Sequence, residues 1–259
     1  SNGDAFAAEF DRRLGGKVSR LRDWSAGAER VVADAVRATF GLTTAELDDA
    51  EAIDRVMNPA KNPYRVDMLD VAYHSPMMRA LNHASYVFEK KLSHTADSQD
   101  QRHRMVPASR PMMTLADTTT PDYITPRLIR QNPSAQAVYE QAMADSWAAK
   151  NKLLALGVPL EYALYILPNA KALRMVESGS FIALQHKWTL RTCFNAQEEI
   201  YLASMDEITQ VRSIHPQLGR HLGPPCVLRN KIVSPRCTEG SHFCGVPVWN
   251  TFPNAERRL

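Results

Sequence analysis

Two short stretches of this sequence carry residues that could bind an anionic ligand. The first is Arg102-His103-Arg104, in which two guanidinium groups flank an imidazole. The planar fork of an arginine matches the oxygen atoms of a phosphate, so the triplet could grip a phosphate or a carbonyl-rich ring. The other interpretation is a solvated basic turn, with His103 as a structural histidine bonded to backbone. The triplet by itself does not decide between them.

The second stretch is WTLRTCFNAQEEI, residues 188–200. If a helix breaks near Phe194, Arg191 ends one helix and Gln197 opens the next, with two glutamates in the first turn, where the helix dipole favours them. An arginine at such a break can hold a ligand phosphate or cap the preceding carbonyl groups. The local sequence favours capping.

A third group of residues near the C-terminus has the chemistry of a metal site. Cys226, Cys237, His242 and Cys244 fall within nineteen positions. Three thiolates and one imidazole suit tetrahedral Zn²⁺, and a short segment rich in proline and glycine would be stabilised by such a structural metal ion. The spacing does not match a standard zinc ribbon, so buried, inert cysteines with a surface histidine remain an equal alternative. We assign Cys193 to the core of a helix.

These residues must be positioned by a mainly helical chain. Apolar residues at steps of three and four predict helices over 4–24 and 26–40, and Thr43-Thr44-Ala45-Glu46 is typical of a capping box for a third. The pair Gly15-Gly16 weakens the first prediction. Strand signals are few, around residues 86–88 and 173–176. Further helices are predicted from Ser134 to Gly157, from Ser180, and over 200–211.

The pattern indicates the α+β class, with helices packed on a small antiparallel sheet. We divide the chain into a helical N-terminal arm (1–58), a main domain (59–220) and a C-terminal extension with the cysteines (221–259). Residues 106–133 hold five prolines, which predict an irregular stretch that lies at the surface or lines a site.

Composition places the chain among ordinary globular proteins. It has 259 residues, 44% hydrophobic and 23% charged, with a net charge of +3. No apolar run reaches the roughly 18 residues of a membrane span, and four cysteines do not suggest a disulfide scaffold. We therefore expect a cytoplasmic protein. Nucleic acid is the least favoured partner, because no basic face with interleaved aromatic residues is visible.

Taken in order, the pieces resemble the flavin-dependent thymidylate synthases (ThyX), whose signature begins Arg-His-Arg. The family also has a later segment reading roughly LGVP and LP, a ligand-binding arginine, and Ala-Gln-x-Glu-Ile. This chain has the same order, over about residues 60–215, in His74-Ser75-Pro76, Arg102-His103-Arg104, Gly157-Val158-Pro159, Leu167-Pro168, Arg191 and 196–200.

The resemblance implies an oligomer with active sites shared between subunits, and a reaction in which FAD, reduced by NADPH, helps transfer a methylene carbon from methylenetetrahydrofolate to dUMP. By this analogy Arg102, His103 and Arg104 would face the flavin and nucleotide phosphate. Gln99, Arg191 and Gln197 would lie near the nucleotide.

Several positions depart from the family pattern. Serines are expected at Pro107 and Met112, and arginines at Thr114, Leu164 and Ile182; an asparagine is expected at Ser180 and a histidine at Asn195. Each lost arginine removes a charge-assisted contact, typically worth ~1.5–3 kcal/mol. The nucleotide site is therefore expected to be eroded. A divergent half of a duplicated protein, acting as a non-catalytic partner of an active copy, is the alternative function.

Overall fold

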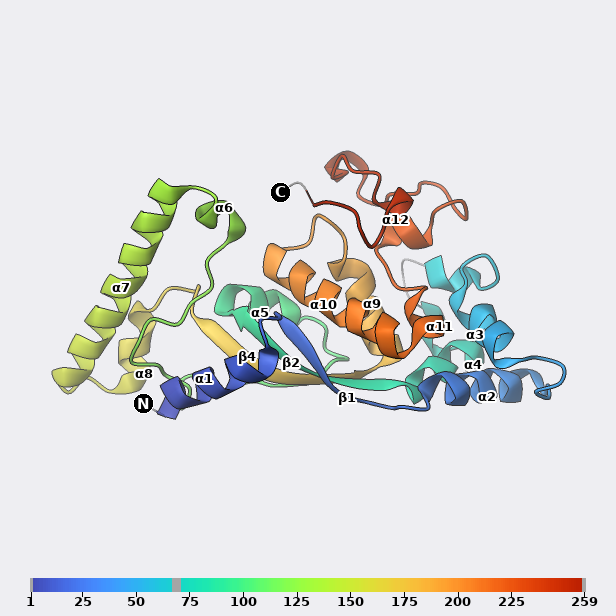
Figure 1. The fold of residues 1–259 in the computed structure, drawn as a ribbon, viewed down its shortest axis with the longest axis horizontal. Coiled ribbons are helices and arrows are strands. Elements are labelled where there is room, and N and C mark those ends of the chain that lie inside the picture. Colours follow the sequence, from blue (N-terminus) through green and yellow to red (C-terminus); the bar gives the residue numbers. More distant parts are fainter. Residues whose placement is uncertain (1, 67–70, 258–259) are drawn as a thin grey trace.

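The structure is a computed structural model that describes residues 2–66 and 71–257. Helices surround a four-stranded sheet, and the molecule is elongated (Figure 1). The strands are β1 (Ser19–Trp24), β2 (Ser85–Ser93), β3 (Ala108–Ser109) and β4 (Ala172–Ser180). The helices are α1 (Asn2–Leu14), α2 (Ala28–Phe40), α3 (Asp49–Met57), α4 (Pro76–Arg79), α5 (His94–Asp100), α6 (Arg127–Arg130), α7 (Pro133–Ala155), α8 (Leu160–Ala163), α9 (Phe181–Arg191), α10 (Glu198–Ile214), α11 (Pro216–Gly219) and α12 (Pro225–Leu228). Short 3-10 turns include η1 (Pro63–Val66), η2 (Val71–His74) and η3 (Ala80–His83).

The predicted helix over residues 4–24 is in fact a helix followed by a strand. Gly15 and Gly16 have φ values of 58° and 81°, a left-handed conformation that ends α1. The chain then enters β1, which pairs with β2. The first part of the chain is thus not wholly helical, and β1 belongs to the sheet of the main domain. The division into three domains stays a prediction.

The sheet is antiparallel, with strand order β1-β2-β4-β3. The central pair, β2 and β4, is in register over nine residues, from Ser85 opposite Ser180 to Ser93 opposite Ala172. Alternate residues of a strand point to opposite faces. Tyr86, Phe88 and Lys90 therefore share one face of β2, while Glu89 and Lys91 lie on the other.

Helices α9 and α10 cover the first face, and a continuous apolar core lies between them and the strands (Figure 1). Trp188 and Phe181 of α9 pack edge-on or tilted against Tyr86 at centroid distances of 6.1 and 6.3 Å. The core continues into α2 and α3, whose buried residues include Val36 and Ile53. The predicted α+β class with a small antiparallel sheet is confirmed.

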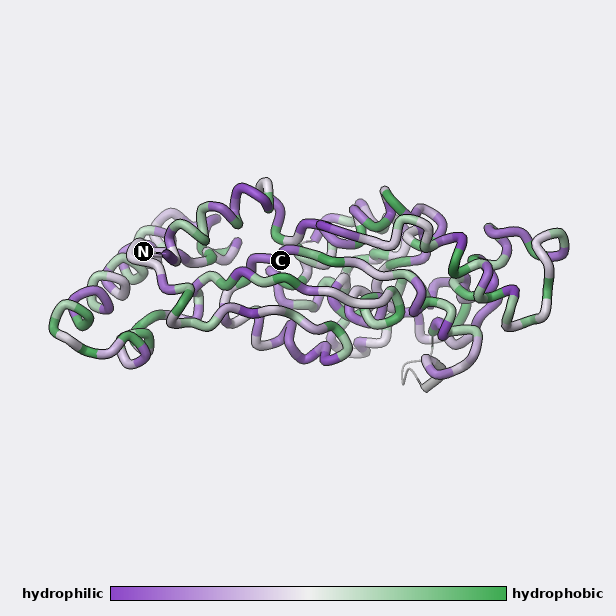
Figure 2. Tube along the Cα trace, turned by 90° about the horizontal axis from the view of Figure 1, so that it is seen from below, coloured by the Kyte–Doolittle hydropathy of each residue, from purple (hydrophilic) through white to green (hydrophobic). Residues whose placement is uncertain are grey.

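Long helix α7 projects away from the sheet at one end of the molecule (Figure 1). Only Met143, Trp147 and Lys150 among its 23 residues are buried. Figure 2 shows apolar stretches both in the strands and at this projecting end. Within the described ranges 2–66 and 71–257, no helix is both apolar and long enough to cross a membrane.

Candidate functional site

The Arg-His-Arg triplet lies in a turn directly after α5. Backbone hydrogen bonds from Arg102 N to Gln99 O (3.2 Å) and from His103 N to Asp100 O (3.1 Å) fold the chain back at this point. The turn leaves Arg102 and Arg104 exposed and places His103 inside, with 8% of its surface accessible. The two arginines thus match the solvated-turn interpretation, whereas the histidine is directed inward.

His103 and Arg191 meet although they are 88 positions apart. Arg191, the last residue of α9, donates a hydrogen bond from Nε to Nε2 of His103 at 2.9 Å. Burial, and then the positive charges of Arg191 and Lys187, lower the pKa of His103 to about 3. The imidazole is therefore neutral near pH 7, with Nε2 as an acceptor, which is the form this contact requires.

Arg191 keeps donors available at this corner. No further hydrogen bond or ion pair of its guanidinium is found in the described part of the chain, and the residue is half-buried. Burial lowers the pKa of Arg191, and the negative charge of Asp100 partly offsets this effect. The positive charge of Arg102 lowers the pKa of Arg191 further, so Arg102 lies close enough to interact with it. Arginines from two separate segments thus place positive charge around one neutral histidine, a suitable environment for an anion.

A buried charge network holds this corner in place; we use this name for Lys90, Asp100, Glu177, Lys187 and Glu207. All five side chains are at most 1% exposed. Lys187 Nζ lies 2.6 Å from Glu177 Oε1 and 2.9 Å from Asp100 Oδ1. Lys90 Nζ lies 2.9 Å from Glu207 Oε1 and 3.4 Å from Asp100 Oδ2. The network therefore ties α5, α9 and α10 to the two central strands.

Two lysines in this network face three carboxylates. Burial works against ionisation of Asp100, but the attraction of Lys90 and Lys187 outweighs it and lowers the pKa of Asp100. For Glu177, burial together with repulsion from Asp100 and Glu207 raises the pKa despite both lysines. Glu177 is thus the member that takes up a proton first as the pH falls. Because Asp100 begins the turn and Lys187 lies on α9, their ion pair also brings His103 to Arg191.

The two predicted glutamine contacts lie at different places. Gln99 is on α5, half-buried, three residues before Arg102. Gln197 caps α10: its Oε1 accepts from Ile200 N at 3.1 Å, and its Nε2 donates to Glu199 Oε1 at 3.3 Å. The Glu199 carboxylate in turn accepts from the backbone and hydroxyl of Ser93. Gln197 therefore caps the start of α10, and the nucleotide contacts of both Gln99 and Gln197 remain predictions.

The predicted zinc site is not supported. Cys226, Cys237 and Cys244 line one small hollow of about 20 Å³, but its fourth cysteine is Cys193, and His242 is exposed outside it. Within the described residues, no group of three or more His, Cys, Asp or Glu side chains is arranged to hold a metal ion. Burial raises the pKa of the Cys226 thiol to about 12. The spacing thus indicated proximity of the cysteines, but the fold presents no ligand tetrahedron.

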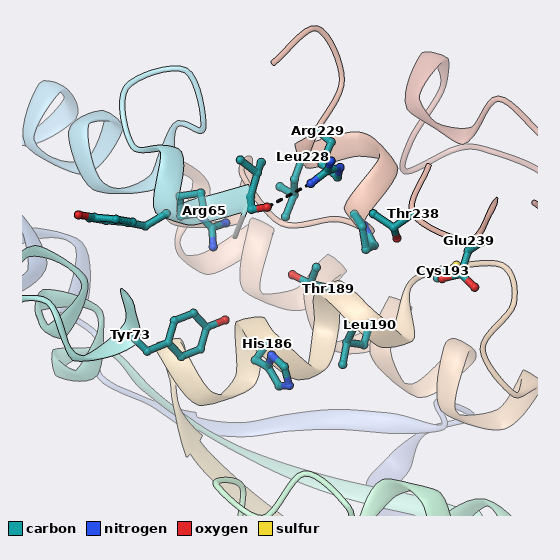
Figure 3. Close-up of a pocket in the computed structure, with 13 residues that line it drawn as sticks. Arg65, Tyr73, His186, Thr189, Leu190, Cys193, Leu228, Arg229, Thr238 and Glu239 are labelled. Carbon is teal, nitrogen blue, oxygen red and sulfur yellow. Dashed lines mark hydrogen bonds between the residues drawn. The ribbon is translucent and has the colours of Figure 1, made fainter. Parts of the chain in front are cut away.

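A cavity of about 300 Å³ opens beside this corner, between α9 and the C-terminal segment, our name for residues 221–257 (Figure 3). His186 of α9 lines it and packs edge-on against His103, with ring centroids 5.8 Å apart. Tyr73 packs edge-on against the same His186 ring at 6.1 Å. Leu190 and Leu228 add apolar side chains to its wall.

Sequence reasoning missed both the cavity and the buried charge network. Lys90 and Glu177 lie in strands next to other polar residues, a pattern that predicts solvent-exposed side chains. Only the register that places Lys90 opposite Met175, beside Glu177, shows that these charges point into the core. His186 has no local signal beyond its position five residues before Arg191.

Comparison with known proteins places these features in a family. Residues 20–217 match the family described as thymidylate synthase complementing protein. The chain is 31% identical over 156 residues to the flavin-dependent thymidylate synthase of Sulfurisphaera tokodaii, covering 59% of this chain and 60% of that protein. It is 26% identical over 247 residues to the flavin-dependent thymidylate synthase of Sulfolobus acidocaldarius, covering 88% and 91% of the two chains. A relative of the same name from Clostridium tetani is 24% identical over 251 residues, covering 90% and 95%. The matched range contains His103, Arg191 and the whole buried charge network, and the chain belongs to the thymidylate synthase complementing protein family.

Proposed function

We propose that this chain is a flavin-dependent thymidylate synthase-like protein that keeps an anion-binding corner for FAD and has an eroded nucleotide site. The family reaction is the reductive methylation of dUMP to dTMP with methylenetetrahydrofolate and NADPH. The observation that carries the proposal is the contact between Arg191 and His103, because it joins the two stretches on which the family resemblance rests.

The residues at the corner fit the diphosphate of a flavin dinucleotide. Arg191 has its outer guanidinium nitrogens without other partners in the described chain, and Arg102 and Arg104 are exposed on the adjoining turn. Arg102 and Arg104 would bind phosphate oxygens of the flavin, while Arg191, held by neutral His103 through Nε, would face the nucleotide. A bound flavin would supply the redox chemistry of the family reaction. The buried charge network keeps the two segments at a fixed separation.

The positions that depart from the family support an eroded nucleotide site. Ile182, where an arginine is expected, is 5% exposed and packs in the main apolar core. Ser180 donates its hydroxyl hydrogen bond to Asn82 Oδ1 at 3.1 Å, and Met112 is 67% exposed. None of the three provides a cation. Losing two or three charge-assisted contacts would weaken dUMP binding by orders of magnitude.

Flavin binding gives the direct test. The purified protein, titrated with FAD and followed by flavin fluorescence, is expected to bind it. Arg102→Gln should weaken binding about 10- to 100-fold, the equivalent of one charge-assisted hydrogen bond of ~1.5–3 kcal/mol. The control is Arg12→Gln, an exposed arginine of α1. A colourless protein with no FAD affinity, or equal binding by both variants, would contradict the proposal.

The second candidate function is a non-catalytic partner that completes an oligomer with an active copy. It is favoured by the exposed apolar residues on and after α7: Val138 is 72%, Leu156 71% and Tyr165 88% exposed. Exposed apolar surface of this kind marks interfaces between proteins. We propose that this apolar surface is buried either in a homo-oligomer or against a sister domain of the same family.

Light scattering tests this second function. The protein is expected to be larger than a monomer, and Val138→Glu should reduce its mass because a charge would then enter the interface. Glu161→Gln, at an exposed position of α8, is the control. A monomeric wild type that also fails to associate with a catalytic family member would exclude the partner role.

We also propose a cytoplasmic location, because the four cysteines are free thiols and reducing compartments keep thiols in this form.

A further inference from the structure

All four cysteines of the sequence meet at one place in the fold, although they come from separate segments of the chain. We name Cys193, Cys226, Cys237 and Cys244 the thiol cluster; together they line the hollow of about 20 Å³ described above. Cys193 lies in the turn after α9, and the other three belong to the C-terminal segment. Each is a free thiol that is partly accessible. Thiols that share one accessible hollow have the chemistry of reversible oxidation.

Contacts around the thiol cluster hold the turn after α9 against the C-terminal segment. Asn195 donates a hydrogen bond from Nδ2 to the backbone oxygen of His242 at 2.6 Å. The buried ring of Phe194 belongs to a small apolar group of the interior, and Cys244 packs against the same group. The stretch that carries Cys193 and the stretch that carries Cys244 therefore lie side by side, as a disulfide between them requires.

The four thiols differ in their readiness to react with an oxidant. Burial raises the pKa of Cys193 and of Cys226, so both stay protonated near neutral pH and are poor nucleophiles. Cys244 follows Phe243, which is 42% exposed, so a small molecule can approach it from solvent. The charge of Cys244 raises the pKa of Cys193 more than the charge of Cys237 does, which indicates that Cys244 is the nearer neighbour.

We propose that Cys193 and Cys244 form a reversible disulfide that fastens the C-terminal segment to the end of α9 when a small disulfide of the glutathione type becomes abundant. The Cys244 thiolate attacks one sulfur of glutathione disulfide, a mixed disulfide forms, and one glutathione thiolate leaves. Cys193 then loses its proton and attacks the Cys244 sulfur, which forms the protein disulfide and releases the second glutathione thiolate. Two cysteine thiols are oxidised and one glutathione disulfide is reduced to two thiols, which take up the two protons that the cysteines lose.

The position of this disulfide links two parts of the chain with different relationships to the family. Cys193 lies inside the matched range, residues 20–217, and Cys244 lies beyond it. The bond would close a loop of about 50 residues, and a cross-link of that length restricts the unfolded chain and stabilises the folded one. A reducing compartment would keep the thiols free, and a shift to oxidising conditions would join them.

Peptide mapping tests the pairing. The purified protein is incubated with glutathione disulfide, the remaining thiols are blocked with an alkylating reagent, and an unreduced digest is analysed by mass spectrometry. The number of free thiols is expected to fall from four to two, with Cys193 linked to Cys244 within one chain. Tm should rise by roughly 5–10 °C and return to its starting value after treatment with dithiothreitol.

Serine variants separate this disulfide from unspecific thiol oxidation. Cys193→Ser should lose both the cross-link and the rise in Tm, whereas Cys226→Ser, a matched control in the same hollow, should keep both. Cys244→Ser should behave like Cys193→Ser and covers the case in which the latter fails to fold. Mixed disulfides with glutathione alone, links confined to other cysteine pairs or to separate chains, or an unchanged Tm of the cross-linked protein would each overturn the proposal. None of these results depends on whether the protein binds flavin or nucleotide.

Discussion

Replacement of Lys187 by methionine is the sharpest perturbation of the buried charge network. The side chain is fully buried, and its ammonium group contacts both oxygens of Glu177, at 2.6 and 2.7 Å, and Asp100 at 2.9 Å. Methionine keeps most of the volume but removes the charge. Asp100 then loses its nearest cation and Glu177 loses one of its two, so that only Lys90 remains as a cation in the network.

The expected loss is about 3–5 kcal/mol in the free energy of unfolding at pH 7, the usual cost of removing one partner of a buried ion pair. The three contacts do not add independently, because they share one ammonium group. A loss of this size is a large part of the ~5–15 kcal/mol that stabilises a typical protein. It should lower Tm by roughly 6–20 °C for a chain of this length.

Urea unfolding followed by circular dichroism measures this loss. Lys152→Met on the exposed face of α7 is the control and should change stability by less than ~0.5 kcal/mol. The loss in Lys187→Met should shrink toward pH 4, because the uncompensated carboxylates then become protonated. A loss below about 1 kcal/mol, or one that grows on acidification, would refute the argument that these charges depend on Lys187.

Three further outcomes follow from the structure. The pKa of Glu177 is raised in the folded state, so ionisation of this group lowers the free energy of unfolding as the pH rises. The stability of the wild type relative to Glu177→Gln should therefore fall with increasing pH. A constant difference between the two proteins in urea titrations from pH 4 to 8 would contradict this. Folding lowers the pKa of His103 from about 6.5 to about 3, so the folded protein keeps this ring neutral where the unfolded chain would protonate it. His103 therefore lowers the stability of the protein progressively as the pH falls from about 6.5 toward 3. Nitrogen NMR should show a neutral ring at pH 5, and a protonated ring would disprove the assignment. Gly219→Ala should cost ~1–3 kcal/mol by overpacking, because a Cβ would lie 2.6 Å from Arg212 Cα, whereas Gly27→Ala, with its nearest neighbour at 4.0 Å, should be nearly neutral in the same denaturation assay.

Much of the helical framework could be predicted from the sequence because it follows local rules. Helix α2 ends where Gly41 adopts a φ of 65°, and α10 extends over the amphipathic stretch 200–211. Strand β1 could not be predicted, since its only aliphatic residue is Leu21 and its stability comes from pairing with β2. Local periodicity is insufficient where a distant strand supplies the hydrogen bonds.

The site was predictable only in part. The order of motifs indicated that the triplet and Arg191 belong together, and the contact of His103 with Arg191 agrees with this. Which member of the triplet points inward depends on the turn after α5, and that turn depends on the buried Asp100. The zinc prediction was wrong because cysteine spacing along the chain does not fix where thiols point. Cys193, assigned to a helix core, lies beside the other three.

The edge strand β1 has a practical consequence for shortening this protein. The family match begins at Arg20, one residue after Ser19, whose hydroxyl donates to Glu207 at 2.8 Å inside the charged interior. Val18 and Ser19 also donate their backbone N–H groups to Asp206. A chain trimmed to the family boundary would lose these three bonds, along with the pairing of Asp11 with Arg174, and would let water reach Glu207. We therefore expect the first nineteen residues to unfold together with the domain that follows them.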